Sequence, residues 1–271
     1  MNKFSQAIAD AIYRFCKPTS RFEHKLLRCQ SYRPESVGRW AAQTRLRPAT
    51  VNKILDKLWI VDRYTIRDLI RRTVEDNAQL FDCESCYVTR FGTPGKSGEV
   101  IFYEFCHTAP DCKRVDDPWK ITDLPPKSTI IFVDDLIGTG TQSLDYIQSR
   151  LSSLLAPSHK PCLFSVCATS TGIEAVRGFS TFEVLCAMEL NEADFNYYHP
   201  ENLAFTSEER EQIQVLNEQL GENFFVMGLL LAFYYSAPDN TMPLIWREEY
   251  NYIDQDNVDQ SWFGLFPRRS G

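Results

Sequence analysis

Two adjacent carboxylates follow an apolar run in the middle of the chain. Ile130 to Val133 are all large and apolar, Asp134 and Asp135 come next, and a Gly/Thr loop lies just beyond them. A buried strand with this pattern delivers the acids to its carboxyl end, where open α/β sheets bind their ligands. A helix is expected to begin near Thr141. The backbone N–H groups of the loop then form a cradle for an anion, so phosphate binding is predicted at Gly138, Thr139, Gly140, Thr141 and Gln142.

The two acids need a partner other than the phosphate, because carboxylates repel phosphate. Sugar hydroxyls or a hydrated Mg²⁺ are the better partners for Asp134 and Asp135. One ligand that combines a phosphate, a diol and a metal-bound pyrophosphate satisfies every group, namely phosphoribosyl pyrophosphate. An ordinary Asp-Asp turn before a helix capped by Thr139 is the alternative interpretation.

The stretch Ile130–Gln142 resembles the fingerprint of type I phosphoribosyltransferases, in which four apolar residues, two acids and a small-Thr-Gly loop follow one another. The resemblance implies that the two acids contact the ribose hydroxyls and hold Mg²⁺, and that the loop holds the 5-phosphate. Gln142 departs from the pattern, because the family usually has Thr or Ser there, and Thr141 stands where the family has a small residue. Ser143 supplies the hydroxyl if the loop shifts by one residue.

A second candidate segment runs from Arg90 to Gly98 and contains Phe-Gly-Thr-Pro-Gly-Lys-Ser-Gly. In phosphoribosyltransferases a loop after an earlier strand binds pyrophosphate through backbone N–H groups and a basic side chain. Lys96-Ser97-Gly98 fit that role by resemblance, with Lys96 neutralising the leaving group and Ser97 capping the next helix. A plain Pro-Gly surface turn is the alternative.

A third segment, Ala237–Trp246, has two prolines around Asp-Asn-Thr and then large apolar residues. It resembles the Asn-Asn-Thr-x-Pro-Leu-x-Trp element of a divergent phosphoribosyltransferase family linked to bacterial conflict systems, including effectors partnered with retrons. Asp239 replaces the first Asn. Val37-Gly38-Arg39-Trp40 and the Phe-Gly-x-Pro-Gly-Lys-Ser-Gly stretch also look like that family. The resemblance implies a toxic effector of antiviral defence with a partner protein or ribonucleoprotein; an Asx-turn and a base-binding role both stay open for the third segment.

Strands and helices alternate around these segments. Strands are expected at Ser85–Phe91, Thr129–Val133, Leu163–Thr169 and Phe182–Ala187. Helices are expected at Ser97–Phe105, Thr141–Leu155 and Gly172–Arg177. This alternation predicts an α/β fold, with right-handed crossovers and a mostly parallel sheet flanked by helices.

Helical patterns dominate the N-terminal part of the chain. Apolar residues three and four apart predict helices between Phe4 and Phe81, one of them capped by Thr65. Prolines that break or begin these helices stand at Pro18, Pro34 and Pro48. We therefore expect a helical N-terminal region over residues 1–82, followed by the phosphoribosyltransferase-like α/β domain over residues 83–271.

The C-terminal part is expected to form a helical hood. Ser207–Leu220 has the pattern of a helix, and the apolar run Phe224–Tyr235 is expected to be a buried one. That run has 12 residues, which is too short to span a bilayer, so no membrane partner is expected.

Composition narrows the class of protein. Hydrophobic residues make up 44% and charged residues 24% of the 271 residues, which argues against a disordered or fibrous chain. The formal net charge of -7 disfavours broad non-specific nucleic-acid binding. Gln, Asp and Arg lie among the first residues, so no signal-peptide core is expected. Nine scattered cysteines then indicate reduced thiols in a cytoplasmic protein.

Some of these cysteines invite a zinc hypothesis. Cys83-x-x-Cys86 forms one ligand pair, but Cys106-His107 and Cys112 make a loose second pair. Cys86 also begins an expected strand, so cysteines serving as small apolar residues are the favoured interpretation.

The remaining catalytic groups are few. Transfer from ribose C1 relies on positioning and charge stabilisation, and the sequence has no obvious Ser/His/Asp or Cys/His constellation. His107 is the one histidine near the expected site, although a lone histidine is more often structural. Thr108–Lys127 is a candidate for a loop that closes over the site, or an ordinary surface loop.

Two other function classes stay open. A non-catalytic nucleotide sensor fits the Gln142 departure and the missing general base. A nucleic-acid or ribonucleoprotein-binding module fits Ser36–Asp56 as a helix-turn-helix. Its expected phosphate contacts are Arg45, Arg47, Asn52 and Lys53. The acceptor cannot be read from the sequence, and a homo-oligomer stays open because many relatives of this fold pair up.

Overall fold

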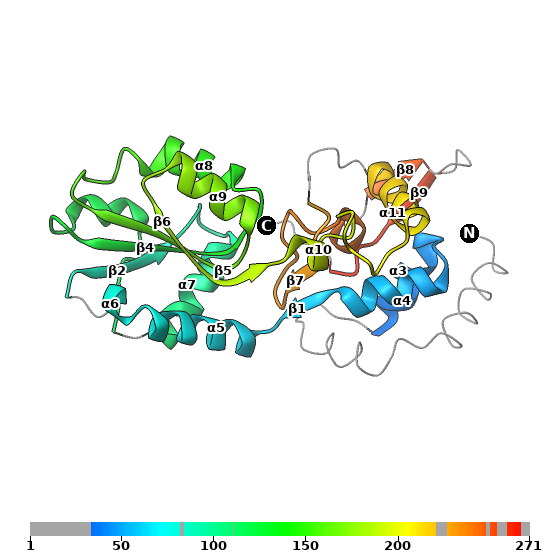
Figure 1. Ribbon diagram of the computed structural model, residues 1–271, viewed down its shortest axis with the longest axis horizontal. Helices are drawn as coiled ribbons and strands as arrows, with labels where there is room; N and C mark the ends of the chain where they lie inside the picture. The colour runs from blue at the N-terminus through cyan, green and yellow to red at the C-terminus, as the bar shows by residue number, and fades with distance from the viewer. Residues whose placement is uncertain are drawn as a thin grey trace. The chain divides into compact units, whose positions relative to one another are not determined.

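The structure is a computed structural model that describes residues 34–81, 84–109, 111–220, 227–247, 250–253 and 259–266. The chain divides into two units, one formed by residues 63–191 and the other by residues 1–62 together with 192–271 (Figure 1). This division differs from the expected boundary after residue 82. Residues 1–33 of the expected helical N-terminal region lie outside the described residues.

The unit of residues 63–191 is built on a five-stranded sheet in which every neighbouring pair is parallel. The strand order is β3-β2-β4-β5-β6, so β4 is central. The strands are β2 (Cys86–Arg90), β3 (Lys113–Arg114), β4 (Thr129–Ile137), β5 (Lys160–Thr169) and β6 (Glu183–Leu190). The expected mostly parallel sheet is confirmed.

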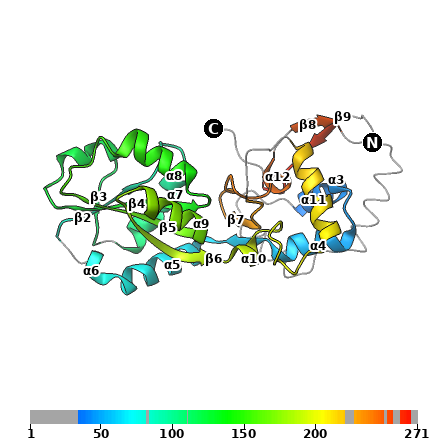
Figure 2. The ribbon, with the colours of Figure 1, turned by 45° about the horizontal axis from the view of Figure 1, so that its top comes forward.

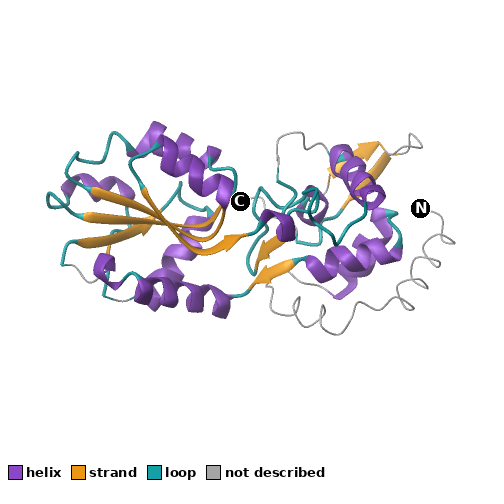
Figure 3. Cartoon of the chain, in the orientation of Figure 1, coloured by secondary structure: helices purple, strands orange, loops and turns teal. Residues whose placement is uncertain are grey.

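Helices cover both faces of this sheet, as the purple and orange elements of Figure 3 show. They are α5 (Arg63–Asp76), α6 (Ala78–Phe81), α7 (Ser97–Thr108), α8 (Thr141–Tyr146) and α9 (Ser170–Phe179). In Figure 1, α8 and α9 lie on one face and α5 and α7 on the other. The face under α8 and α9 is an apolar core that includes Ile130, Phe132, Leu163, Ile147, Ile173 and Val176. On the other face the ring centroids of Phe105 and Phe164 lie 5.2 Å apart.

The helix α8 is shorter than the expected Thr141–Leu155. After Tyr146 the chain widens into a π-helical turn over Ile147–Leu151 and then leaves the helical conformation. Two side chains of that turn, Ile147 and Leu151, are buried in the core. The helical pattern in the sequence therefore predicted the burial of these two side chains correctly, but it placed the end of the helix too late.

A buried carboxylate attaches α5 to this unit. Glu104 of α7 is fully buried, and its two oxygens accept bonds from Arg63 Nε at 2.6 Å and Arg67 Nε at 2.7 Å. A buried charge is costly unless paired, so α5 must present both arginines to α7. Residues four apart share a helix face only if the helix already includes Arg63. The expected cap at Thr65 is therefore wrong, since Thr65 lies inside α5.

The second unit combines segments from both ends of the chain. Its elements are α3 (Pro34–Thr44), α4 (Pro48–Lys57), β1 (Trp59–Val61), α10 (Glu192–Phe195), α11 (Ser207–Gln219), β7 (Leu231–Phe233), α12 (Pro243–Trp246), β8 (Tyr250–Ile253) and β9 (Asp259–Trp262). Pro34 and Pro48 begin helices, as expected. The strands β8 and β9 pair as an antiparallel hairpin, visible in Figure 2. No helix in the described part of the chain is long and apolar enough to cross a membrane.

The apolar run expected to be a helix contains a strand instead. Leu231–Phe233 forms β7, which pairs in parallel with β1 at Trp59–Val61. The residues from Leu229 to Tyr234 are all buried, so the run has no periodicity that separates a helix from a strand. Its partner strand lies far away in the sequence. The C-terminal part is thus a mixture of helices and strands, and residues 221–226 lie outside the described residues.

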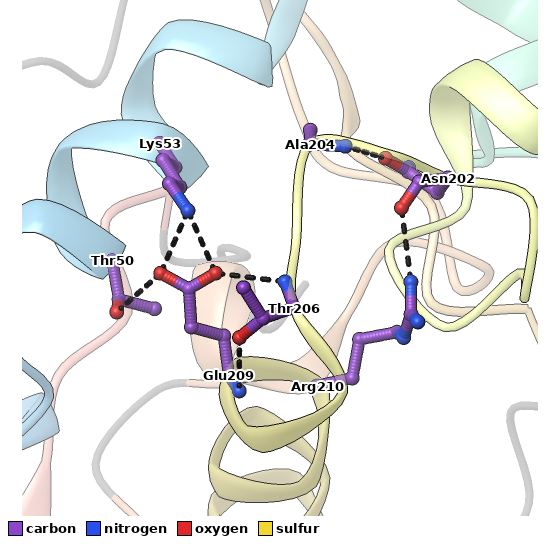
Figure 4. A network of polar contacts seen from close by, with 7 residues as sticks. All are labelled: Thr50, Lys53, Asn202, Ala204, Thr206, Glu209 and Arg210. Atoms are coloured by element: carbon purple, nitrogen blue, oxygen red, sulfur yellow. Dashed lines mark hydrogen bonds and ion pairs between the residues drawn. The ribbon is translucent and has the colours of Figure 1, made fainter.

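The basic residues of the expected helix-turn-helix have acidic partners. Arg47 Nη2 lies 2.8 Å from Glu208 Oε1, and Lys53 Nζ lies 2.9 and 2.7 Å from the two oxygens of Glu209. Figure 4 shows that Glu209 also accepts bonds from Thr50 Oγ1 at 3.1 Å and from the Thr206 N–H at 2.9 Å. Arg47 and Lys53 therefore connect the α4 segment to α11, and each already has an acidic partner; their expected role as phosphate contacts stays a prediction.

The Glu209 network makes stability depend on acidic pH. Burial alone would raise the pKa of Glu209, but the bonds from Lys53, Thr206 and Thr50 lower it from 4.5 to about 2. A depressed folded pKa contributes stability above the unfolded pKa, and this contribution is lost as pH falls from about 4.5 to about 2. We expect Glu209→Gln to lose roughly 2 to 3 kcal/mol at pH 7 and little near pH 2.

Thermal unfolding of Glu209→Gln and wild type between pH 7 and pH 2.5 tests this expectation. The gap between the two melting temperatures should close as pH falls. Glu208→Gln is the matched control, because its exposed ion pair with Arg47 contributes at most about 1 kcal/mol. A gap that stays constant over the whole range would contradict the assignment.

Candidate functional site

The two acids lie inside β4 rather than after it. The strand continues to Ile137, because β5 pairs with it as far as Asp134 with Ser165 and Ile137 with Ala168. Asp134 is half-buried and Asp135 is buried at 7% exposure. The carboxylate of Asp134 accepts a bond from the N–H of Asp135 at 2.9 Å.

Ser97 joins the two candidate segments. Its hydroxyl oxygen lies 3.0 Å from Asp135 Oδ1 and 3.4 Å from Asp134 Oδ1. The expected capping role of Ser97 is wrong: Lys96 is the residue before the helix, and Ser97 is the first residue of α7. The hydroxyl points to the acids instead. Two segments separated by almost forty residues in the sequence thus form one site.

Gly98 makes this meeting sterically feasible. A Cβ atom at position 98 would lie 2.2 Å from the carbonyl oxygen of Phe91 and 3.2 Å from that of Val133. Any side chain there would push the start of α7 away from β2 and β4. The first turn of α7 therefore sits directly against the strand ends, which brings Ser97 to the acids.

The acid pair is electrostatically strained. Burial raises the pKa of Asp134 well above its ordinary value, and the charge of Asp135 raises it further. The N–H of Asp135 and the hydroxyl of Ser97 act in the opposite direction. Ionisation of both carboxyls becomes favourable when a cation or hydroxyl groups arrive.

The oxygen donors fit Mg²⁺. Carboxylates are the ligands that Mg²⁺ prefers in proteins, and it usually keeps several waters or substrate oxygens. Within the described residues no group of three His, Cys, Asp or Glu side chains is placed to hold a metal ion. A Mg²⁺ ion at Asp134 and Asp135 would therefore take its other ligands from water and a bound substrate.

The loop after β4 is held in a conformation that glycine permits. Gly140 has φ +79°, and a Cβ there would lie 2.9 Å from the Cβ of Ala175. The helix α8 begins at Thr141, as expected, so Thr139 lies one residue outside the position of the cap. The hydroxyl of Thr139 instead lies 3.1 Å from that of Thr141.

Two residues that the sequence reasoning missed support this loop from β5 and α9. The hydroxyl of Thr169 donates to the carbonyl of Gly138 at 2.7 Å and accepts the N–H of Gly172 at 3.0 Å. A Cβ at Gly172 would lie 2.1 Å from the same carbonyl. The signal in the sequence was a threonine at the end of a strand followed three residues later by glycine.

The Gly92–Lys96 loop adjoins the same site. Gly92 and Gly95 have φ of +86° and +81°, which glycine adopts without strain. The hydroxyl of Tyr146 in α8 donates to the carbonyl of Gly92 at 3.1 Å, and its ring packs on Phe91 at 4.9 Å. The side chain of Lys96 is exposed at the start of α7.

His107 lies away from the acid pair. His107 lies ten residues after Ser97 on α7, about 15 Å along the helix, and its Nδ1 contacts the carbonyl of Tyr103 at 2.8 Å. An acid or base role at Asp134 and Asp135 is therefore contradicted for this histidine. The segment Thr108–Lys127, expected to be a closing loop or an ordinary surface loop, contains β3 and a 3₁₀ helix, η1 (Pro118–Asp123), and its Asp116 carbonyl accepts a bond from Arg90 Nη1 at 2.6 Å.

The side chains of the element Ala237–Trp246 mainly pack inside their own unit. The hydroxyl of Thr241 donates to the carbonyl of Leu231 at 2.5 Å, and Trp246 Nε1 donates to the carbonyl of Thr241 at 2.8 Å. Trp40 Nε1 donates to the carbonyl of Leu244 at 2.7 Å. All of these side chains are buried, so the two resembling segments at Trp40 and Trp246 pack against each other within one unit.

The parallel sheet, the acids at the end of its central strand and the Gly/Thr loop define a phosphoribosyltransferase-type fold. Residues 37–268 match the model of the PRTase-CE family. The chain belongs to this family and is a phosphoribosyltransferase-like protein. Among curated proteins no relative is found.

Distant likenesses occur among solved structures. A hypoxanthine-guanine-xanthine phosphoribosyltransferase is 12% identical, with a TM-score of 0.33 over 47% of this chain and 75% of that one. Orotate phosphoribosyltransferase from Aeropyrum pernix is 15% identical, with a TM-score of 0.33 over 46% and 70%. The APRTase from Giardia lamblia, complexed with 9-deazaadenine, is 14% identical, with a TM-score of 0.33 over 46% and 80%.

The strain on the acid pair predicts a stabilising substitution. A carboxyl whose folded pKa is raised loses stability as pH rises through that pKa. We expect Asp134→Asn to raise the melting temperature at neutral pH, with a difference that shrinks at acidic pH. The exposed acid Asp145 on α8 serves as control, since Asp145→Asn should change stability by no more than about 0.5 kcal/mol. A lower melting temperature for Asp134→Asn at neutral pH would contradict this interpretation.

The two glycines of α9 provide a matched pair. Gly172→Ala forces a methyl group against the Gly138 carbonyl and should cost about 1 to 3 kcal/mol while displacing the loop. Gly178→Ala meets nothing within 4 Å and should be neutral or gain up to about 1 kcal/mol from helix propensity. Urea unfolding of both variants measures the contrast. Equal effects of the two substitutions would show that the loop does not depend on this contact.

Proposed function

We propose that the chain binds phosphoribosyl pyrophosphate with Mg²⁺ and transfers the phosphoribosyl group to an acceptor. The observation that carries the proposal is the contact of Ser97 with both Asp134 and Asp135. It gathers an acid pair and two glycine-containing loops at the carboxyl ends of β2 and β4, where α/β sheets bind ligands.

Each group has a distinct role in this proposal. The amides and hydroxyls of Gly138, Thr139, Gly140, Thr141 and Gln142 hold the 5-phosphate. Asp134 and Asp135 bind the ribose hydroxyls and share Mg²⁺. Lys96, Ser97 and Gly98 lie at the pyrophosphate, where the Lys96 charge stabilises the departing group.

The reaction then depends on positioning. An acceptor nucleophile attacks ribose C1 while the bond to pyrophosphate breaks, through a transition state with oxocarbenium character. Bound Mg²⁺ supplies positive charge at the pyrophosphate oxygens. Asp134 and Asp135 orient the ribose, and the loop of residues 138–142 fixes its phosphate end, so that C1 faces the acceptor.

The proposed acceptor is a nucleobase, a nucleotide or a macromolecule. By the resemblance of Val37–Trp40 and Ala237–Trp246 to the conflict-system family, the transfer serves as a toxic effector activity in cytoplasmic antiphage defence. A retron-type partner protein or ribonucleoprotein, or a second copy of the chain, would then control it.

A non-catalytic nucleotide sensor is the second candidate. Gln142 supports it, because an amide replaces the family hydroxyl at the end of the phosphate loop. The distance of His107 from the acids also supports it, because His107 was the one histidine expected near the site. A sensor binds the nucleotide without releasing pyrophosphate. The nucleic-acid-binding alternative is weaker, because Arg47 and Lys53 already have acidic partners.

Calorimetric titration of phosphoribosyl pyrophosphate with Mg²⁺ tests the proposal. We expect wild type to bind and Asp134→Asn/Asp135→Asn to bind at least roughly tenfold more weakly, because each bond to a charged group contributes about 1.5 to 3 kcal/mol. Asp145→Asn controls for the loss of an acid near the loop. Equal binding by the double variant and wild type would exclude the acid pair as the site.

Pyrophosphate release then separates the two candidates. A protein that binds the ligand and releases pyrophosphate in the presence of a nucleobase, nucleotide or macromolecular acceptor is the transferase. Binding without release from any acceptor class would favour the sensor.

A further inference from the structure

A carboxylate of the protein itself sits on the Gly92–Lys96 loop. Glu99, in the first turn of α7, accepts the N–H of Gly95 through Oε2 at 2.9 Å. Its other oxygen, Oε1, lies 3.6 Å from Arg90 Nη1. The carboxylate thus lies between a backbone amide and a guanidinium. The same two groups would bind an oxyanion of a ligand through charge-assisted hydrogen bonds.

Arg90 makes a second contact besides the one with Glu99, and its side chain is largely buried. Its side chain is only 14% exposed at the end of β2, and Nη1 donates to the carbonyl of Asp116 at 2.6 Å. Its Nε atom is buried and has no hydrogen-bond partner among the residues that the structure describes. A guanidinium that is largely removed from water and has an unsatisfied N–H donor binds an anion favourably.

The bond from Gly95 is not an ordinary helix cap. A glutamate in the first turn commonly reaches back to the N–H of the residue before the helix. Here that residue is Lys96, whose N–H contacts the carbonyl of Thr93 at 3.4 Å. Glu99 reaches one residue further back, to the N–H of Gly95, which has a positive φ of +81°.

We infer that Arg90 and the Gly95 N–H form an oxyanion subsite that Glu99 occupies in the free protein, and that a pyrophosphate oxygen of the ligand displaces the Glu99 carboxylate. This inference rests on the proposed function, because it assigns the Gly92–Lys96 loop to the pyrophosphate. Glu99 then competes with the ligand in every binding event. Arg90 becomes a pyrophosphate-binding residue in addition to Lys96.

The competition has a measurable consequence. A ligand must break the Gly95 contact and move a negative charge away before it binds, so the apparent affinity is lower than that of the open subsite. Glu99→Gln keeps the side-chain shape and an oxygen acceptor for Gly95 but removes the charge. A unit charge about 4 Å away contributes about 1 kcal/mol in water, so we expect Glu99→Gln to bind pyrophosphate roughly fivefold more tightly.

The experiment titrates inorganic pyrophosphate and phosphoribosyl pyrophosphate, each with Mg²⁺, into four proteins. These are wild type, Glu99→Gln, Glu99→Gln/Arg90→Gln and the control Glu75→Gln, which removes an exposed acid of α5. The inference expects tighter binding of both ligands by Glu99→Gln, no gain in the double variant and no change in Glu75→Gln. Circular dichroism and melting temperatures establish that each variant is folded.

The outcomes separate this inference from the proposed function. If wild type and Glu99→Gln bind phosphoribosyl pyrophosphate equally well, the inference is wrong and the proposed function stands. A gain that persists in a folded double variant also overturns it, because the subsite would not need Arg90. If no protein binds either ligand, both the inference and the proposed function fail. Binding by Glu99→Gln alone, or more tightly than by wild type, supports both.

Discussion

The candidate site in the unit of residues 63–191 depends on the contact of two consecutive carboxyl groups, one half-buried and one buried, with one serine hydroxyl. Asp134 and Asp135 lie on the central strand, so the same sheet that buries them also fixes their position. Ser97 reaches them only because Gly98 lets α7 approach β2 and β4 closely. The β-sheet, the first turn of α7 and the two adjoining loops are thus arranged around a pair of acids that resist joint ionisation.

Other buried acids in the chain show what a structural carboxylate looks like. Glu104 is surrounded by Arg63 and Arg67, and Glu209 by Lys53 and hydroxyl and amide donors. The network around Glu209 lowers its pKa to about 2, which stabilises the charged form. The surroundings of Asp134 raise its pKa instead. A carboxyl group whose surroundings disfavour its charge is a candidate for ligand binding, whereas Glu104 and Glu209 already have cationic partners within the protein.

The sequence predicted the parallel sheet well, because strands such as Thr129–Val133 carry unbroken apolar runs that only a doubly covered sheet requires. It also predicted the acid pair and the loop of residues 138–142, since glycine and threonine at fixed offsets have local causes. The prediction of secondary structure failed where every residue is buried. All three residues of Leu231–Phe233 are apolar, so the segment has no periodicity, and its partner strand β1 lies in another part of the sequence. Thr65 failed as a cap because Glu104, a distant residue, determines where α5 begins.

The contact between Ser97 and the acids could not be read from either segment alone. Serine before a glycine at a helix start is normally a capping signal, whereas here β2 pairs with β4 and the hydroxyl of Ser97, which follows β2, contacts Asp135 of β4. The supports of the loop, Thr169 and Gly172, were missed for the same reason, since their partner is the carbonyl of Gly138 on another connection.

The residues that carry the family resemblance fall into two physical kinds. Trp40, Thr241 and Trp246 are buried and bind backbone carbonyls of their own unit, so substitution of any of them is resisted by packing whatever the acceptor is. Resemblance at such positions therefore reports the fold of the unit and carries no information on the substrate. The acid pair differs, because burial and the charge of Asp135 raise the pKa of Asp134, so ionised Asp134 is expected to destabilise the folded chain at neutral pH. The proposed function is built on the acids rather than on the tryptophans, because the acids resist joint ionisation and contact a serine of a second candidate loop.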